Sequence, residues 1–146
     1  GFGPQESYVD KRAGAAKGQY IVPVRENGQP YIRPQETGSH CGTEWGAVYD
    51  RDGAGLFVGS SRAFSFSALP YTAAELTAAG HDWELPPSEK TVLCADYKQA
   101  GIGSASCGPD LLEKYRFSDK DFHFSLCLRP FAEKPDFWTW MGYPKG

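Results

Sequence analysis

Apolar and polar positions alternate along several short stretches of the chain. The clearest stretch is 121–130, where four apolar side chains alternate with polar ones (Phe122, Phe124, Leu126 and Leu128). In 63–68, Phe64 and Phe66 alternate with two serines in the same way. A two-residue period predicts half-buried β-strands whose apolar side chains share one face.

Turn residues separate these stretches. The apolar runs 44–49 and 55–59 flank Asp50–Ala54, in which Asp52-Gly53 favours a tight turn, so the pattern predicts a β-hairpin. Further short strands are expected at 20–24, 31–33, 91–97 and 114–117. One short helix is expected over 72–79, because Thr72 and Glu75 have the spacing of a capping box and Gly80 follows as a stop signal.

The composition agrees with this pattern. The 146 residues include 9 Phe, 8 Tyr, 4 Trp, 17 Gly and 11 Pro, a mixture that favours strands and turns. The length suits one domain. The fold class predicted is all-β, an antiparallel β-sandwich with one short helix.

Charge and hydropathy exclude several classes of partner. The net charge is −3 and no segment concentrates Lys and Arg, so we expect no nucleic-acid partner. The apolar runs are shorter than a bilayer span, so we expect a soluble chain with no membrane partner. The cysteines at 41, 94, 107 and 127 have neither zinc-site spacing nor disulfide density, which favours free thiols and a cytoplasmic location. Because the chain opens on Gly1 without Met, we expect a fragment or a processed chain.

Catalytic motifs are weak throughout. The 18 Asp and Glu residues include no pair that the sequence singles out, so we expect no catalytic residue in this chain. The glycine-rich segment 101–106 resembles a phosphate-binding loop, but Pro109 follows at once where such a loop needs a long helix. A nucleophilic Cys107 would need a histidine base, and all three histidines are distant in sequence (His40, His81 and His123).

Aromatic side chains could bind sugars, because a flat ring stacks on the C–H face of a pyranose. Trp45 and Trp83 lie beside expected strands and are expected in the core. Trp138 and Trp140 alternate in the C-terminal segment and could anchor it to another surface.

Five segments, taken in order, resemble a known family. They are GFGPQESYVDKR (1–12), PYIRPQETGSHCGTEW (30–45), FSFSALPYTAAELTAAGHDWEL (64–85), DYKQAGIGSASCGPD (96–110) and the stretch from YRF to FHFSLCLRP (115–130). Together they resemble the C-terminal domain of large bacterial β-galactosidases of glycoside hydrolase family 2. We therefore divide the chain into a family-like region, residues 1–130, and a C-terminal extension, residues 131–146.

The resemblance implies a β-supersandwich related to galactose-mutarotase-like folds, packed against a TIM barrel that carries both catalytic glutamates. It implies a parent enzyme that hydrolyses terminal β-D-galactosides such as lactose with retention. It also implies galactosyl transfer to sugar acceptors and a homo-oligomer. No cofactor is expected in this chain, and Mg²⁺ and Na⁺ are expected elsewhere in the parent.

The resemblance also marks a loop at the edge of the substrate pocket, with Ser106, Cys107 and Gly108 as its candidate binding residues. Some members carry a Trp that stacks on substrate where this chain has Cys107. A thiol offers no aromatic face, so we expect a looser subsite for the sugar acceptor. Two alternatives stay open: a freestanding module that binds galactose or another carbohydrate, and the small subunit of a split β-galactosidase.

Overall fold

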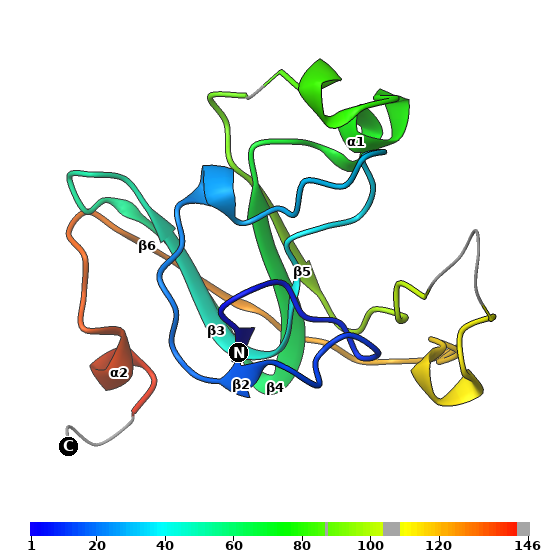
Figure 1. Cartoon of the computed structure of the whole chain (residues 1–146). Helices are drawn as coiled ribbons and strands as arrows, with labels where there is room; N and C mark the ends of the chain where they lie inside the picture. The colour runs from blue at the N-terminus through cyan, green and yellow to red at the C-terminus, as the bar shows by residue number, and fades with distance from the viewer. Residues whose placement is uncertain (87, 104–108, 143–146) are drawn as a thin grey trace.

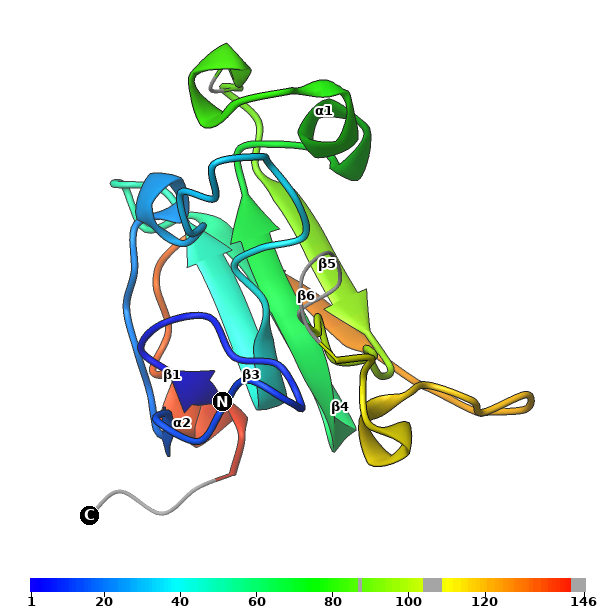
Figure 2. The same ribbon diagram turned by 45° about the vertical axis from the view of Figure 1, so that its right-hand side comes forward.

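The fold is organised around one long strand, β4 (Gly55–Leu69). In the computed structural model, which describes residues 1–86, 88–103 and 109–142, β3 (His40–Tyr49) pairs antiparallel with one side of β4. The other side of β4 pairs first with β6 (Cys127–Phe131) and then with β5 (Val92–Asp96). Figures 1 and 2 show β3, β4 and β5 as neighbouring strands of one twisted sheet.

The hairpin between β3 and β4 forms as expected. Asp50 closes the turn, because its carboxylate accepts the backbone N–H groups of Asp52 at 2.9 Å and Ala54 at 3.0 Å. Gly53 has φ +91°, which side-chain-bearing residues rarely adopt. The register then pairs Tyr49 with Gly55 and Ala47 with Phe57.

Smaller elements surround this sheet. The strands β1 (Phe2–Gly3) and β2 (Ala16–Lys17) form a second, two-stranded sheet. The helix α1 (Ala73–Ala78) begins at the capping box of Thr72 and Glu75, as expected, and lies beyond the end of β4 (Figure 2). The other short helices are the 3₁₀ turns η1 (Val24–Glu26), η2 (Asp82–Glu84) and η3 (Glu113–Tyr115), and the α-helix α2 (Phe137–Trp140). The chain is therefore all-β and antiparallel, with two sheets and few short helices.

The C-terminal segment returns to cover the hairpin, and its helix α2 was not expected. Phe137 is 5% exposed, and its ring packs against Trp45 at 5.1 Å and Phe131 at 5.6 Å between centroids. Trp140 makes a T-shaped contact with Phe57, with 5.7 Å between ring centroids. The described part of the predicted extension, residues 131–142, thus packs on the neighbouring strands, and β6 itself ends at Phe131.

Several expected strands are wrong, and the backbone explains why. The apolar segment 20–24 is irregular up to η1, since Pro23 lacks the N–H that a strand ladder needs. The segment 31–33 lies between Pro30 and Pro34 and also forms no strand. In 114–117 the chain forms η3 instead, where Tyr115 N–H donates to the Leu112 carbonyl at 2.9 Å.

The strand expected over 121–130 is shorter than its alternation suggests. Only the segment from Cys127 onward pairs with β4, opposite Gly55–Gly59, and β5 pairs further along the same edge, opposite Ser65–Leu69. Phe122 is 56% exposed and Leu128 is 60% exposed, so the apolar face expected to be buried is largely uncovered in this chain. No helix among the described residues is long and apolar enough to cross a membrane.

Candidate functional site

The expected binding residues Ser106, Cys107 and Gly108 lie outside the described residues. The structure describes the loop on both sides of them, through Gly103 and again from Pro109. The described residues therefore form the base of this loop. We refer to residues 100–109 as the pocket-edge loop.

The carboxylate of Asp10 holds the first arm of the pocket-edge loop. One carboxylate oxygen accepts the backbone N–H of Ile102 at 3.1 Å, and the other accepts that of Gly103 at 2.9 Å. On the preceding residue, Gly101 N–H donates to the carbonyl of Tyr115 at 2.9 Å. Three successive amides are thus fixed, two of them by a charged acceptor, which makes the stronger kind of hydrogen bond.

Two glycines permit this close approach. A Cβ at Gly101 would lie 2.4 Å from the carboxyl carbon of Asp10, so a side chain there would collide with the carboxylate. Gly103 has φ +63°, in the left-handed region that favours glycine. The glycines therefore allow the backbone of the loop to contact the Asp10 carboxylate directly.

Asp10 lies in a turn that is fixed on both sides. Tyr8 and Lys11 exchange backbone hydrogen bonds of 3.2 and 3.0 Å across it. Ser7 pairs with the start of β3, where its N–H donates to the Ser39 carbonyl at 2.7 Å. Tyr8 is 1% exposed, so the turn begins in the core.

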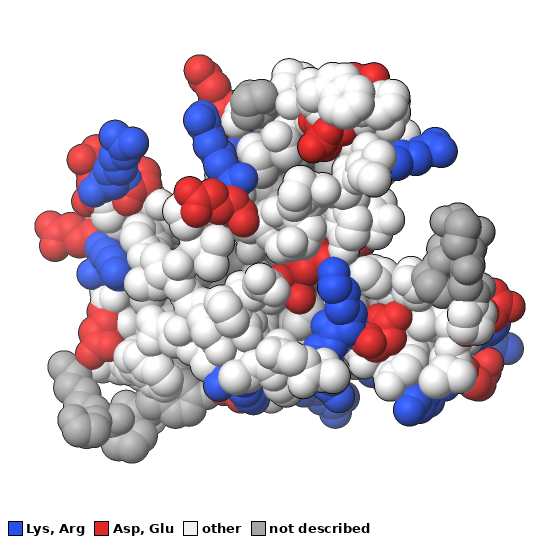
Figure 3. Space-filling view, viewed as in Figure 1, with Lys and Arg blue, Asp and Glu red and all other residues white. Residues whose placement is uncertain are grey.

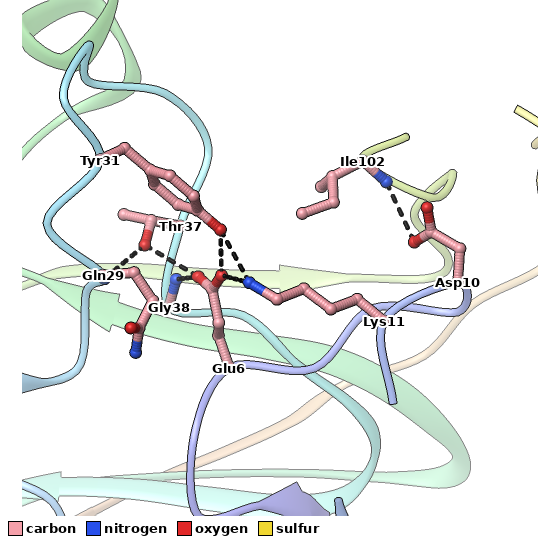
Figure 4. A network of polar contacts seen from close by, with 8 residues as sticks. All are labelled: Glu6, Asp10, Lys11, Gln29, Tyr31, Thr37, Gly38 and Ile102. Carbon is pink, nitrogen blue, oxygen red and sulfur yellow. Dashed lines mark hydrogen bonds and ion pairs between the residues drawn. The ribbon is translucent and has the colours of Figure 1, made fainter. Parts of the chain in front are cut away.

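A buried carboxylate ties the same turn to the following coil (Figure 4). The Glu6 side chain is 1% exposed, and one of its oxygens accepts Lys11 Nζ at 2.6 Å and the hydroxyl of Tyr31. The other oxygen accepts the hydroxyl of Thr37 and the N–H of Gly38, both at 2.8 Å. We call these five residues the Glu6 network.

The electrostatics of the Glu6 network favour an ionised carboxylate. Burial by itself raises the pKa of Glu6, but the hydrogen bonds from Lys11, Tyr31, Gly38 and Thr37 outweigh it and hold the pKa below its ordinary value. Burial and the neighbouring carboxylate raise the pKa of Tyr31, which keeps that hydroxyl protonated as a donor. The network is therefore a satisfied structural unit rather than a group poised to exchange protons.

Sequence reasoning did not identify Glu6 and Asp10 as partners of the loop. Asp10 and Gly103 are 93 positions apart, and Glu6 and Tyr31 are 25 apart. No spacing rule connects such positions. The only available signal was that both carboxylates lie in the first resembling segment and the glycines in the fourth.

The other candidate residues have ordinary structural roles. His81 pairs with Glu84 at 3.0 Å, and His123 lies 3.3 Å from the Ser125 hydroxyl. Trp45 is half-buried in the aromatic cluster around Phe137, whereas Trp83 is 74% exposed, so its expected place in the core is wrong.

The described surface includes a largely apolar cavity, and charges of both signs are mixed on one face. A cavity of about 610 Å³ lies beside β3, lined largely by apolar side chains that include Tyr20, Phe66 and Trp138. On the face shown in Figure 3, acidic and basic side chains are interspersed without a basic patch. Cys41, Cys94 and Cys127 are free thiols.

Comparison with known proteins identifies the family. Residues 1–128 match the family described as beta galactosidase small chain. The chain is 47% identical over 128 residues to a β-galactosidase of Actinobacillus pleuropneumoniae, covering 88% of this chain and 12% of the relative. It is 40% identical over 129 residues to a β-galactosidase of Staphylococcus xylosus, covering 88% of this chain and 13% of the relative.

A β-galactosidase of Streptococcus thermophilus is 35% identical over 133 residues, which cover 89% of this chain and 13% of that relative. The chain thus spans only about an eighth of the length of the relatives it matches. Because the family match covers most of its residues, the chain belongs to the β-galactosidase small-chain family.

Proposed function

We propose that this chain is the C-terminal, non-catalytic part of a retaining β-galactosidase of glycoside hydrolase family 2. The parent enzyme would hydrolyse terminal β-D-galactosides such as lactose, and the pocket-edge loop would border its substrate pocket. The relatives are β-galactosidases that share this segment, which supports the assignment.

The observation that carries this proposal is the fixed base of the pocket-edge loop. A loop that binds substrate must present its residues in one geometry, and supporting hydrogen bonds provide that geometry. Asp10 supplies two such bonds, and the Glu6 network fixes the turn that carries Asp10. Ser106, Cys107 and Gly108 come three to five positions after Gly103 in the sequence and are the proposed contacts with sugar.

The carboxylates of the described residues support a non-catalytic role. Glu6 and Asp10 are engaged by structural donors. Burial raises the pKa of both Glu36 and Asp96, and the nearby Asp96 carboxyl raises that of Glu36 further. We propose that both catalytic glutamates lie in the TIM-barrel domain of the parent enzyme, as the family resemblance implies.

The ions implied for the parent are also assigned elsewhere. The described residues contain no group of three or more His, Cys, Asp or Glu side chains arranged to hold a metal. We propose that Mg²⁺ and Na⁺ are bound by other domains of the enzyme.

The uncovered apolar side chains support a chain that packs against further protein. Ile32 is 85% exposed, Trp83 is 74% exposed and Leu128 is 60% exposed. We propose that the TIM-barrel domain or another subunit of a cytoplasmic homo-oligomer covers such residues. The intact mass of the native protein distinguishes this from a freestanding carbohydrate-binding module, and a separate neighbouring gene would indicate a split enzyme.

Two measurements test the proposal. The purified chain should not hydrolyse a chromogenic β-galactoside, and turnover would place catalytic carboxylates within it. In the complete enzyme, Cys107→Trp should lower KM for lactose and raise galactosyl transfer to glucose, because the indole adds a face for the acceptor. Cys107→Ser is the matched control without a ring. Unchanged KM and unchanged transfer in Cys107→Trp would contradict the role of the loop.

A further inference from the structure

The strand β3 lies at the edge of its sheet. One side of β3 pairs with β4, and over residues 45–49 the described part of the chain supplies no strand on the other side. Alternate residues of an antiparallel strand direct their N–H and C=O groups to opposite sides, so about half of these backbone groups face away from β4. Such an edge is a ready site for pairing with another strand.

The cavity of about 610 Å³ lies along this edge of β3. Residues 45–49 line it, and so does the coil 18–23 between β2 and η1. Figures 1 and 2 show this coil running beside β3 on the side away from β4. Ile21 is 73% exposed, and its neighbours Tyr20 and Val22 are exposed as well. The cavity therefore lies between an open strand edge and an apolar coil that is not covered.

The lining of the cavity comes from both faces of the sheet. Trp45 packs against Phe137, with 5.1 Å between ring centroids. The next residue is Gly46, on which a Cβ would lie 2.8 Å from the ring of Phe66. All four residues line the cavity, and successive side chains of a strand point to opposite faces. An occupant that contacts both apolar faces and the backbone edge between them has the form of a further β-strand.

The size and lining of the cavity favour polypeptide over water or a small ligand. A volume of about 610 Å³ corresponds to about twenty waters at roughly 30 Å³ each, and a largely apolar lining gives them few hydrogen-bond partners. Protein interiors are close-packed and leave few voids larger than a water molecule. A small ligand would cover the apolar walls but would leave most of the outward backbone groups of β3 without a partner.

We propose that an extended segment of the parent enzyme, from outside residues 1–146, fills this cavity and pairs with residues 45–49 as an added strand. The inference rests on the proposed function only in that the chain is part of a longer enzyme. The chain spans about an eighth of the relatives it matches, so most of such an enzyme is available to supply the segment. Because both walls are apolar, the added strand is a near-continuous run of about five apolar residues.

A second copy of this chain fits the cavity less well. The coil 18–23 lies along the cavity and is anchored at one end in the sheet of β1 and β2 and at the other in η1. A sheet that approached β3 edge-on would have to displace this coil, whereas a single extended segment can lie between the coil and β3 (Figure 2).

Hydrogen exchange on the complete enzyme, resolved by residue, tests the pairing. The reference is residues 55–59 of β4, which pair with β3 on one side and with β6 on the other. The amides of residues 45–49 that face away from β4 should exchange as slowly as those of the reference, because the added strand accepts them. Exchange of these amides at the rate of exposed loop amides would show an open edge and overturn the inference.

A photo-crosslink identifies the occupant. Benzoylphenylalanine at position 21 of the complete enzyme should crosslink to an apolar run of the same polypeptide outside residues 1–146. The same probe at position 13, where the exposed Ala13 does not line the cavity, should not reach that run. Crosslinks at position 21 only to residues within 1–146, or to β3 of a second copy, would overturn the inference.

A matched pair of substitutions tests the packing of the added strand on the coil. Ile21→Lys places a charge in the cavity, and the outward amides of residues 45–49 should then exchange roughly tenfold faster. Ile32→Lys is the control, because Ile32 is 85% exposed and does not line the cavity. Equal exchange in the two variants and the wild type would contradict an apolar strand between the coil and β3.

The outcomes separate this inference from the proposed function. An open β3 edge in an enzyme whose galactosyl transfer responds to Cys107→Trp overturns the added strand alone. A native protein no longer than this chain overturns the proposed function and the added strand together.

Discussion

Replacing Glu6 tests whether the Glu6 network stabilises the base of the pocket-edge loop. In Glu6→Gln, the amide nitrogen is best placed toward Tyr31 and Lys11, because the Tyr31 hydroxyl can rotate to accept and Lys11 is 47% exposed. The amide oxygen then still accepts from Thr37 and Gly38. The substitution therefore removes the negative charge that pairs with Lys11, and hydration of the Lys11 ammonium group offsets part of the lost stability.

The magnitude follows from these contacts. An ion pair with a half-exposed lysine is worth up to about 1 kcal/mol, and charge strengthens the remaining bonds by a similar amount, so Glu6→Gln should cost about 2 kcal/mol. Glu6→Ala should cost about 3 to 5 kcal/mol, because it leaves the donors of Thr37 and Gly38 buried without an acceptor. The exposed Glu89→Gln serves as the control and should change stability by less than about 0.5 kcal/mol.

The assay is hydrogen exchange on the complete enzyme. The N–H of Gly38 donates directly to Glu6, so its exchange reports the opening of the network. A loss of about 2 kcal/mol makes that exchange roughly thirtyfold faster. If Glu6→Gln exchanged no faster at Gly38 than Glu89→Gln, the network would not be the stabilising unit that its geometry indicates.

Three further results are expected. Phe137→Ala should destabilise the C-terminal segment by about 3 kcal/mol and speed its proteolysis after residue 131, whereas the exposed Glu133→Ala should not. Gly46→Ala should cost about 1 to 3 kcal/mol in thermal unfolding, because its Cβ would lie 2.8 Å from the Phe66 ring, while Gly14→Ala, with open space, should be neutral. Because the folded pKa of Glu6 lies below its ordinary 4.5, its stabilisation is complete above that pH and is lost as pH falls through the folded value. Wild-type exchange at Gly38 should therefore accelerate in acid more steeply than in Glu6→Gln. Equal acid dependence of the Gly38 exchange in wild type and Glu6→Gln would contradict the role of the Glu6 carboxylate. A loss of stability in Glu133→Ala or Gly14→Ala as large as in Phe137→Ala or Gly46→Ala, respectively, would contradict the packing of Phe137 or Gly46.

Local signals in the sequence predicted the elements that local contacts determine. The hairpin at Asp50–Ala54 and the cap at Thr72 both depend on side-chain bonds within four residues, so their motifs sufficed. The strand β5 lies almost where it was expected, within 91–97. The hairpin and β5 are among the predicted strands on which the all-β fold class was based.

Elements that depend on a distant partner were not predictable in this way. The alternation over 121–130 describes which side chains share a face, but pairing with β4 decides that the strand begins at Cys127. The apolar segment 20–24 likewise has no ladder partner among the described residues, and Ile21 is 73% exposed. An apolar segment is expected to be buried, but its sequence does not show which other surface covers it.

The candidate site also has one part that the sequence predicted and one part that it did not. Resemblance located the pocket-edge loop through Ser106, Cys107 and Gly108, and their contact with substrate stays a prediction. The contact between the Asp10 carboxylate and the pocket-edge loop could not be predicted from the sequence. Its partners are 92 and 93 positions away, and they are backbone amides, which every residue except proline has. Only the folded chain brings the two segments together.

A structure of the complete enzyme with galactose and a sugar acceptor bound tests the central claim most directly. The proposed function predicts that residue 107 lies at the mouth of the catalytic pocket, in contact with the acceptor at about 4 to 4.5 Å, with Asp10 bound to the amides of Ile102 and Gly103 as in this chain. A pocket-edge loop that faces solvent or another subunit, with residue 107 remote from the bound sugars, would contradict it.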